Sequence, residues 1–156
     1  MFSGFRHVTI MLTAAAVGAT LWLLPAQASA RATPATTYAA KAFRTTNAHR
    51  VHHDRVRLKK GACLTRAAER WARQMARSGR LTHQRLGPVL TGCHVSWAGE
   101  NIAVGFPSGA SVVTRGWMRS SGHRANVLRP QYRLMGVGAA RDRHGRWWVS
   151  QVFGRR

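Results

Sequence analysis

Acidic residues are nearly absent from this chain of 156 residues, which contains 4 Asp and Glu against 25 Lys and Arg. The four acids are Asp54, Glu69, Glu100 and Asp142. Mechanisms that need several clustered carboxylates, such as two-metal phosphoryl transfer or a calcium cage of oxygen ligands, are therefore nearly excluded. The sequence also lacks any apolar run beyond residue 24 that is long enough to span a bilayer.

The formal net charge of +21 predicts attraction to polyanions, such as wall polymers, anionic lipid headgroups or nucleic acid. The basic residues are spread along the chain, and no stacking-aromatic or helix-turn-helix signature accompanies them. We therefore interpret the charge as a surface property that favours adsorption to anionic envelope polymers or lipids. Sequence-specific binding of nucleic acid is not expected. The hydrophobic content of 45% is enough for the core of one domain.

The first 30 residues have the layout of a secretory signal peptide. Arg6 and His7 precede an apolar run over residues 8–24, Pro25 ends the run, and Ala28–Ala30 offers small residues for cleavage. The alternative is an uncleaved N-terminal anchor. The layout favours a cleaved signal peptide of residues 1–30 and a secreted, extracellular protein.

The chain has two cysteines, Cys63 and Cys93, for which two states are open. In an exported protein they can form a disulfide, which would contribute on the order of 3–4 kcal/mol by closing a loop of about 30 residues. The alternative is a pair of buried free thiols. The predicted export favours the disulfide.

Residues 31–36 are interpreted as a flexible lead-in, and a first helix is expected from Thr37 to about His52. A second helix has the clearest pattern, because its apolar residues recur at helical spacing and Gly79 offers a left-handed cap. Those apolar residues are Leu64, Ala67, Ala68, Trp71, Ala72, Met75 and Ala76. Residues 86–92 are expected to form a loop because they hold two glycines and a proline.

A short extended piece is expected at residues 95–97, a third helix at 110–119 and a short turn at 123–128. Alternating residues in 135–139 and 147–153, separated by Asp142–Gly145, then predict an antiparallel hairpin. The adjacent Trp147 and Trp148 should face opposite sides of their strand, so that one ring can be exposed. Helices followed by a hairpin, without βαβ regularity, indicate the α+β class.

Three stretches, in this order and spacing, resemble the CAP superfamily of cysteine-rich secretory, antigen-five and group-one pathogenesis-related proteins, and its bacterial secreted (SCP-like) branch in particular. They are Leu81–His83, Gly99–Ala103 and Trp117–Leu128, the last reading Trp-x-x-Ser-x-Gly-His-Arg-x-Asn-x-Leu. Asn47 and Arg50 fit the Asn-x-x-Arg of the family's first helix. Residues 136–138 and 151–154 fit its closing hairpin.

The resemblance implies a CAP domain over residues 37–156, built as an α-β-α sandwich with a central antiparallel sheet and stabilised by a Cys63–Cys93 pair. It also implies a cleft lined by two histidines and two acids. His83, Glu100 and His123 match three of these four positions. The second acid is missing, because Ser120 and Ser121 stand where it is expected.

His83 and His123 are candidate ligands for a divalent ion such as Zn²⁺, with Glu100 orienting one imidazole. Two histidines without a third firm ligand predict a weak site. The alternative, which is compatible with it, is a hydrogen-bonded cluster of the same three residues that holds the sheet to its helices. Asn101 and Asn126 are interpreted as structural amides. The remaining histidines (His49, His52, His53, His94 and His144) are expected to be exposed, and a metal site at the first three lacks other nearby ligands.

Three functions compete at this point. A non-enzymatic, monomeric binding module would hold a small lipid-like or anionic ligand in the cleft, while its basic surface adsorbs to the envelope; this fits the resemblance best. A hydrolase would use Glu100 or His123 to activate water, assisted by a metal or His83. A cationic protein would act on membranes or walls through charge alone. Ser121 is not expected to be a nucleophile, because no Gly-x-Ser-x-Gly elbow surrounds it.

Overall fold

The computed structural model describes Met1 and residues 33–156. The proposed signal peptide therefore lies almost entirely outside the described residues, as do the first two residues of the proposed lead-in. The other lead-in residues 34–36 form the first turn of a helix, so the expected start at Thr37 was wrong. This helix, α1 (Pro34–His52), begins earlier because the Thr33 side chain accepts a hydrogen bond from the Thr36 backbone N–H. Pro34 fits at the first helical position, where its missing N–H has no intrahelical partner to lose.

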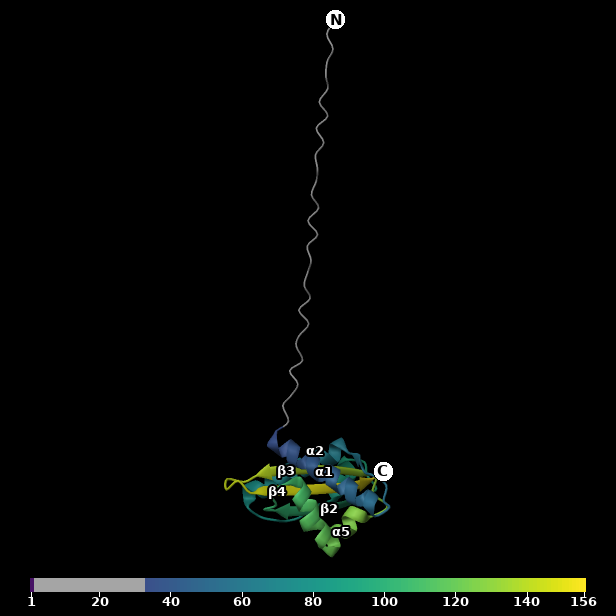
Figure 1. Ribbon diagram of the computed structural model, residues 1–156, viewed down its shortest axis with the longest axis vertical. Coiled ribbons are helices and arrows are strands. Elements are labelled where there is room, and N and C mark those ends of the chain that lie inside the picture. The colour runs from purple at the N-terminus through teal and green to yellow at the C-terminus, as the bar shows by residue number, and fades with distance from the viewer. Residues whose placement is uncertain (2–32) are drawn as a thin grey trace. The chain divides into compact units, whose positions relative to one another are not determined.

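Four strands form the central sheet in the order β1-β3-β4-β2. They are β1 (Lys59–Lys60), β2 (Trp97–Val104), β3 (Leu134–Arg141) and β4 (Trp147–Arg155). The predicted hairpin is confirmed as the antiparallel pair of β3 and β4, and β2 pairs with the other side of β4, as Figure 1 shows. The two-residue β1 pairs in parallel with β3 and was not predicted, because two exposed lysines carry no strand pattern.

Helices cover both faces of the sheet, which makes the α-β-α sandwich that the resemblance implied. On one face lies α2 (Ala62–Ser78), together with α3 (Gly87–Gly92). On the other face lie α1 and the segments from residue 109 to 128. Because both faces are covered, Trp147 and Trp148 point to opposite sides and are both buried, at 7% and 3% exposure. The prediction that one ring can be exposed was wrong for this reason.

Close approach of α2 to the sheet depends on two glycines of β3. A Cβ atom at Gly136 would overlap the backbone of Leu64 and Thr65, and one at Gly138 would overlap that of Ala68. The helix backbone therefore lies directly against the strand, and the small alanines of α2 are buried there. The predicted helix and its left-handed cap at Gly79 are confirmed, with φ of 66° at the glycine.

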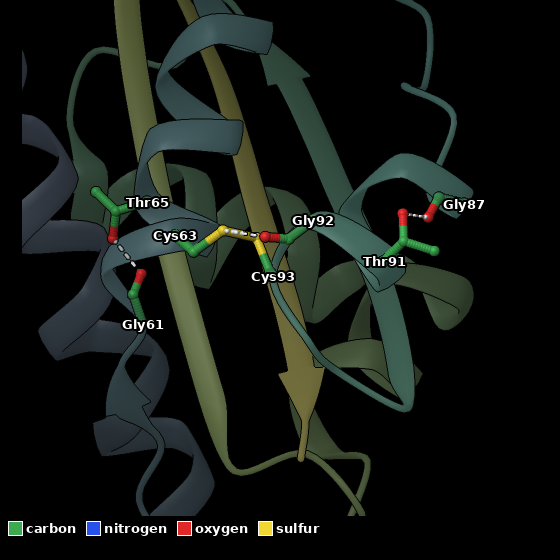
Figure 2. Close-up of a disulfide and its surroundings, with 7 residues drawn as sticks. All are labelled: Gly61, Cys63, Thr65, Gly87, Thr91, Gly92 and Cys93. Carbon is green, nitrogen blue, oxygen red and sulfur yellow. Dashed lines mark hydrogen bonds between the residues drawn. A yellow bond between two sulfur atoms is a disulfide. The ribbon is translucent and has the colours of Figure 1, made fainter.

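A disulfide joins Cys63, near the start of α2, to Cys93, immediately after α3 (Figure 2). The disulfide is thus the state adopted, not the pair of free thiols. The prediction of a loop at residues 86–92 was wrong, because residues 87–92 form the helix α3. Pro88 sits in the first turn, where a helix tolerates proline, and the buried Val89 and the disulfide anchor the segment.

The segment expected as a third helix is irregular. It consists of α4 (Gly109–Ser111), the π-helical turn η1 (Val112–Gly116) and the 3₁₀ turn η2 (Trp117–Arg119). This path lets the buried Trp117 donate its indole N–H to the Ile102 carbonyl at 3.2 Å. The short turn expected at residues 123–128 is the helix α5 (Ser121–Leu128), which packs the fully buried Val127 inward.

Candidate functional site

Glu100 is the centre of the site and its carboxylate is fully engaged. It lies on β2 with a side chain only 1% exposed. Its Oε2 accepts from Nδ1 of His83 at 2.9 Å and from the backbone N–H of Gln84 at 3.1 Å. Its Oε1 accepts from the Gln84 amide at 2.6 Å and from the Ser150 hydroxyl at 2.7 Å. Four donors occupy the lone pairs of the two oxygens, so this carboxylate holds structure in place.

His83 lies in the connection between α2 and α3, and its side chain is 57% exposed. Among residues 33–156, only Nδ1 is held, by Glu100, which leaves Nε2 as the ring nitrogen available to a ligand. Sequence reasoning missed Gln84 and Ser150, the other side chains bonded to Glu100. Gln84 directly follows a motif residue and could have been noticed, whereas Ser150 is brought close only by the pairing of β2 with β4.

His123 lies in α5, and its Nδ1 is 2.9 Å from the hydroxyl oxygen of Ser120. A neutral hydroxyl thus orients the ring at the place where the resemblance implied a second acid. Burial lowers the pKa of His123, and the nearby charge of His83 lowers it further. Both effects favour the neutral imidazole, the form that binds a metal or accepts a proton.

Two asparagines tie α5 to the edge strand β2. Asn101 donates to the His123 carbonyl at 3.1 Å. Asn126 donates to the Glu100 carbonyl at 3.2 Å and to the side-chain oxygen of Asn101 at 3.0 Å. His83 and Glu100 are therefore in direct contact, and His123 is linked to them through this amide network.

Asn47 and Arg50 act away from the cleft. Asn47 exchanges two hydrogen bonds with the backbone of Leu58, at 3.0 and 2.8 Å. The fully buried Arg50 donates to the carbonyls of Val56 and Val127, at 2.8 and 2.7 Å. Burial lowers the pKa of Arg50 to about 10. Both residues thus connect the end of α1 to the chain that follows it.

A hollow of about 460 Å³ opens beside Glu100. Besides His83 and Glu100 it is lined by Leu86, Trp97, Arg129 and Tyr132, among others, whereas His123 does not line it. Trp97 is 43% exposed. Nε of Arg129 is buried and has no hydrogen-bond partner in the part of the chain that the structure describes. Sequence reasoning did not single out Trp97 or Arg129, because nothing in the motifs marks them.

No group of three or more His, Cys, Asp or Glu side chains is arranged to hold a metal ion among residues 33–156. The two predicted ligands, His83 and His123, each have Nδ1 in a hydrogen bond, so each would offer its Nε2 to a metal. Zn²⁺ accepts imidazole nitrogen, so these residues fit a weak site and not a closed one.

The histidines at the end of α1 are less exposed than expected. His49 and His53 are half-buried, because His49 contacts the Thr114 hydroxyl at 3.2 Å and His53 contacts the His49 carbonyl at 2.8 Å. Burial, followed by the charges of His53 and His52, lowers the pKa of His49.

Within residues 33–156, none of the helices combines the length and apolar character that crossing a bilayer requires.

The sequence model of the CAP family, described as the cysteine-rich secretory protein family, matches residues 43–153. The uncharacterized protein YkwD of Bacillus subtilis (strain 168) is 43% identical over 58 residues, which are 37% of this chain and 21% of that protein. The chain therefore spans about one fifth of the length of this relative.

Solved structures show the same fold. An extracellular protein of Bacillus anthracis that contains an SCP domain matches with a TM-score of 0.70 and 26% identity, over 78% of this chain and 41% of that one. A cysteine-rich secretory protein from Staphylococcus aureus matches with a TM-score of 0.67 and 22% identity, over 79% and 40%. Both proteins are more than twice as long as the part that this chain matches.

Proposed function

This chain belongs to the cysteine-rich secretory protein (CAP) family, and from that premise we propose that it is a secreted, non-enzymatic binding module. Its cleft takes a small lipid-like or anionic ligand, and its basic surface adsorbs to polyanionic components of the cell envelope. One observation carries the choice of binding over hydrolysis: Glu100 already accepts four hydrogen bonds. A general base needs a free lone pair directed at the proton it removes, and Glu100 has none to spare.

The hollow beside Glu100 supports the choice of ligand. Trp97 and Leu86 offer apolar surface, and the buried Tyr132 lies behind them in the lining. Arg129 adds a guanidinium to the lining. An anionic headgroup would pair with its positive charge, while a short alkyl chain would cover the indole of Trp97.

Calorimetric titration with decanoate and with decanol tests this ligand class. We expect decanoate to bind more tightly, and we expect Arg129→Gln to remove the preference while sparing the binding of decanol. Arg85→Gln removes one exposed arginine outside the hollow and serves as the control. Equal affinity of both ligands for the wild-type protein would contradict an anionic headgroup. Ester hydrolysis that is lost in Glu100→Gln would instead favour the hydrolase.

A weak metal site formed by His83, which lines the hollow, and His123, which does not, is the second candidate, supported by the hydrogen bonds that hold Nδ1 of both rings. When bound, Zn²⁺ would supply a Lewis acid coordinated by the two Nε2 atoms and water. We expect millimolar Zn²⁺ to raise the melting temperature at pH 7, and the increase to vanish in His83→Ala. It should weaken below about pH 6, because protonated imidazole cannot bind metal. A melting temperature insensitive to Zn²⁺ would end this proposal.

A further inference from the structure

Arginines gather where the end of α2 meets the tip of the β3–β4 hairpin. Arg73 and Arg77 lie on α2, and Arg141, Arg143 and Arg146 lie on the hairpin; all five are exposed. Together they line a hollow of about 660 Å³. Arg73 and Arg77 also line a second hollow of about 340 Å³, which continues to Arg70 and Gln84. We call the two adjoining hollows the arginine groove.

The arginine groove has almost no negative charge of its own. Asp142 is the single acid in its lining, so five arginines and one aspartate leave a formal charge of +4 in the larger hollow. The Asp142 side chain is only 4% exposed and pairs with Arg146 at 2.8 Å. Its oxygens also accept from the Trp148 indole and from the backbone N–H of His144 and Arg146, each at 2.9 Å. Within the described residues, the other four arginines of this hollow form no ion pair.

This arrangement favours an anion from outside. Arg73 and Arg77 are one turn apart on α2, so their like charges repel each other unless an anion lies between them. One hairpin arginine is held in advance on the α2 side, because Arg146 lies over the Trp148 ring at 5.6 Å, whereas Arg141 lies over the Trp147 ring at 4.5 Å on the opposite face of the sheet. Side chains that are already ordered lose less entropy when they bind.

We propose that the arginine groove binds a linear chain of phosphate groups, which runs from the hairpin across Arg73 and Arg77 toward Gln84. Guanidinium groups match phosphate oxygens with two parallel hydrogen bonds, and they stay charged at any physiological pH. Two hollows that share Arg73 and Arg77 suit a chain better than a single ion, and their concave form suits a chain better than a flat lipid surface. Trp147 and Trp148 are buried, and the half-buried Trp71 of the second hollow is a single ring, so the groove offers no run of platforms for successive bases and recognises the phosphates. The inference rests on the proposed adsorption to polyanions and names the place where it occurs.

Calorimetric titration with polyphosphate at about 0.15 M salt, the physiological ionic strength, compares two double variants with the same loss of charge. Arg73→Gln/Arg77→Gln removes the two arginines that the hollows share. Arg115→Gln/Arg119→Gln removes two exposed arginines that line neither hollow. We expect the first pair to weaken binding about tenfold or more and the second less than about threefold. The slope of the logarithm of the binding constant against the logarithm of the salt concentration should correspond to about two fewer phosphate contacts in the first double variant only.

The possible outcomes distinguish a failure of the arginine-groove proposal from a failure of the proposed adsorption to polyanions, on which it rests. Equal weakening in both double variants would overturn the groove and leave general adsorption standing. A wild-type protein that binds neither polyphosphate nor vesicles of phosphatidylglycerol would overturn both. Binding to such vesicles without binding to polyphosphate would overturn the groove in favour of a lipid surface. Thermal melting of both variants, which we expect to be unchanged, verifies that the fold is intact.

Discussion

Two connections in this protein are each built around one buried carboxylate, yet they expose opposite kinds of surface. The connection from α2 to α3 wraps around Glu100, which is held by His83, Gln84 and Ser150. The hairpin loop between β3 and β4 wraps around Asp142, which is held by Trp148, Arg146 and two backbone N–H groups. Beside the first lies the hollow lined by His83 and Trp97, and beside the second lies the arginine groove.

The comparison explains what the scarcity of acids means in the folded protein. Both carboxylates are used to hold the backbone of a loop, and neither remains free for a ligand. A partner therefore meets neutral or positively charged groups at both places. The two loops also differ in length: bonded strands close the hairpin directly, whereas the longer connection is additionally tied by the disulfide.

Removing the disulfide should produce the largest effect and should act mainly on the α2–α3 side. We expect Cys63→Ala/Cys93→Ala to lower the free energy of unfolding by about 3–4 kcal/mol, because a loop of about 30 residues is no longer closed in the unfolded chain. Denaturant unfolding measures the change, and hydrogen exchange locates it. Amide protection should fall further in residues 79–96, where local opening adds to the loss of global stability, than in the hairpin. An equal loss at the hairpin would contradict the division into two loops.

Replacing the carboxylate of the longer connection should be the next most damaging change. Glu100→Gln replaces one accepting carboxylate oxygen with an amide NH₂ group, which cannot accept hydrogen bonds. The buried donors that faced this oxygen lose their partner, so we expect the free energy of unfolding to fall by about 2–4 kcal/mol. Glu69→Gln makes the same substitution at a half-buried site and should change stability by less than about 0.5 kcal/mol. Urea unfolding compares the two variants. Similar stability of both would show that Glu100 does not organise the connection.

Asp142→Asn should have a smaller effect that depends on pH. The hydrogen bond from the Trp148 indole, with those from Arg146 and His144, holds the pKa of Asp142 well below its usual value. A lowered pKa in the folded state adds stability above the unfolded pKa of about 4, and this contribution is lost as the pH falls below it.

The wild-type protein should therefore exceed Asp142→Asn in stability at pH 7, and the difference should shrink between about pH 4 and pH 2. Asp54→Asn is the matched control, since Asp54 is exposed and forms no side-chain hydrogen bond within residues 33–156. Thermal unfolding at several pH values measures both variants. A difference that stays constant with pH would show that the charge of Asp142 contributes nothing.

Local patterns were sufficient for much of the fold. The apolar spacing of α2, its cap at Gly79 and the alternation in the hairpin were all confirmed. The prediction of a loop at residues 86–92 failed, because Pro88 was weighed without the disulfide that anchors its helix. The prediction that Trp147 or Trp148 can be exposed failed because alternation does not say whether the second face is covered.

The candidate site likewise combines residues that the sequence predicted with contacts that only the structure revealed. The order of the motifs pointed to His83, Glu100 and His123. It also showed that Ser120 stands where the resemblance implies a second acid. It did not reveal that the Ser120 hydroxyl contacts His123, nor that Ser150 completes the hydrogen bonds of Glu100. Ser150 and Glu100 are far apart in the sequence and meet only because β2 and β4 pair.

By itself, the sequence determined the family resemblance, the excess of positive charge and the two cysteines, since each of these is a property of residue identity and order. Only the tertiary structure decided that both carboxylates are consumed by loop hydrogen bonds and that five of the arginines share one hollow. Hydrogen bonding and the repulsion between like charges depend on distance, and these distances are set by packing between elements far apart along the chain.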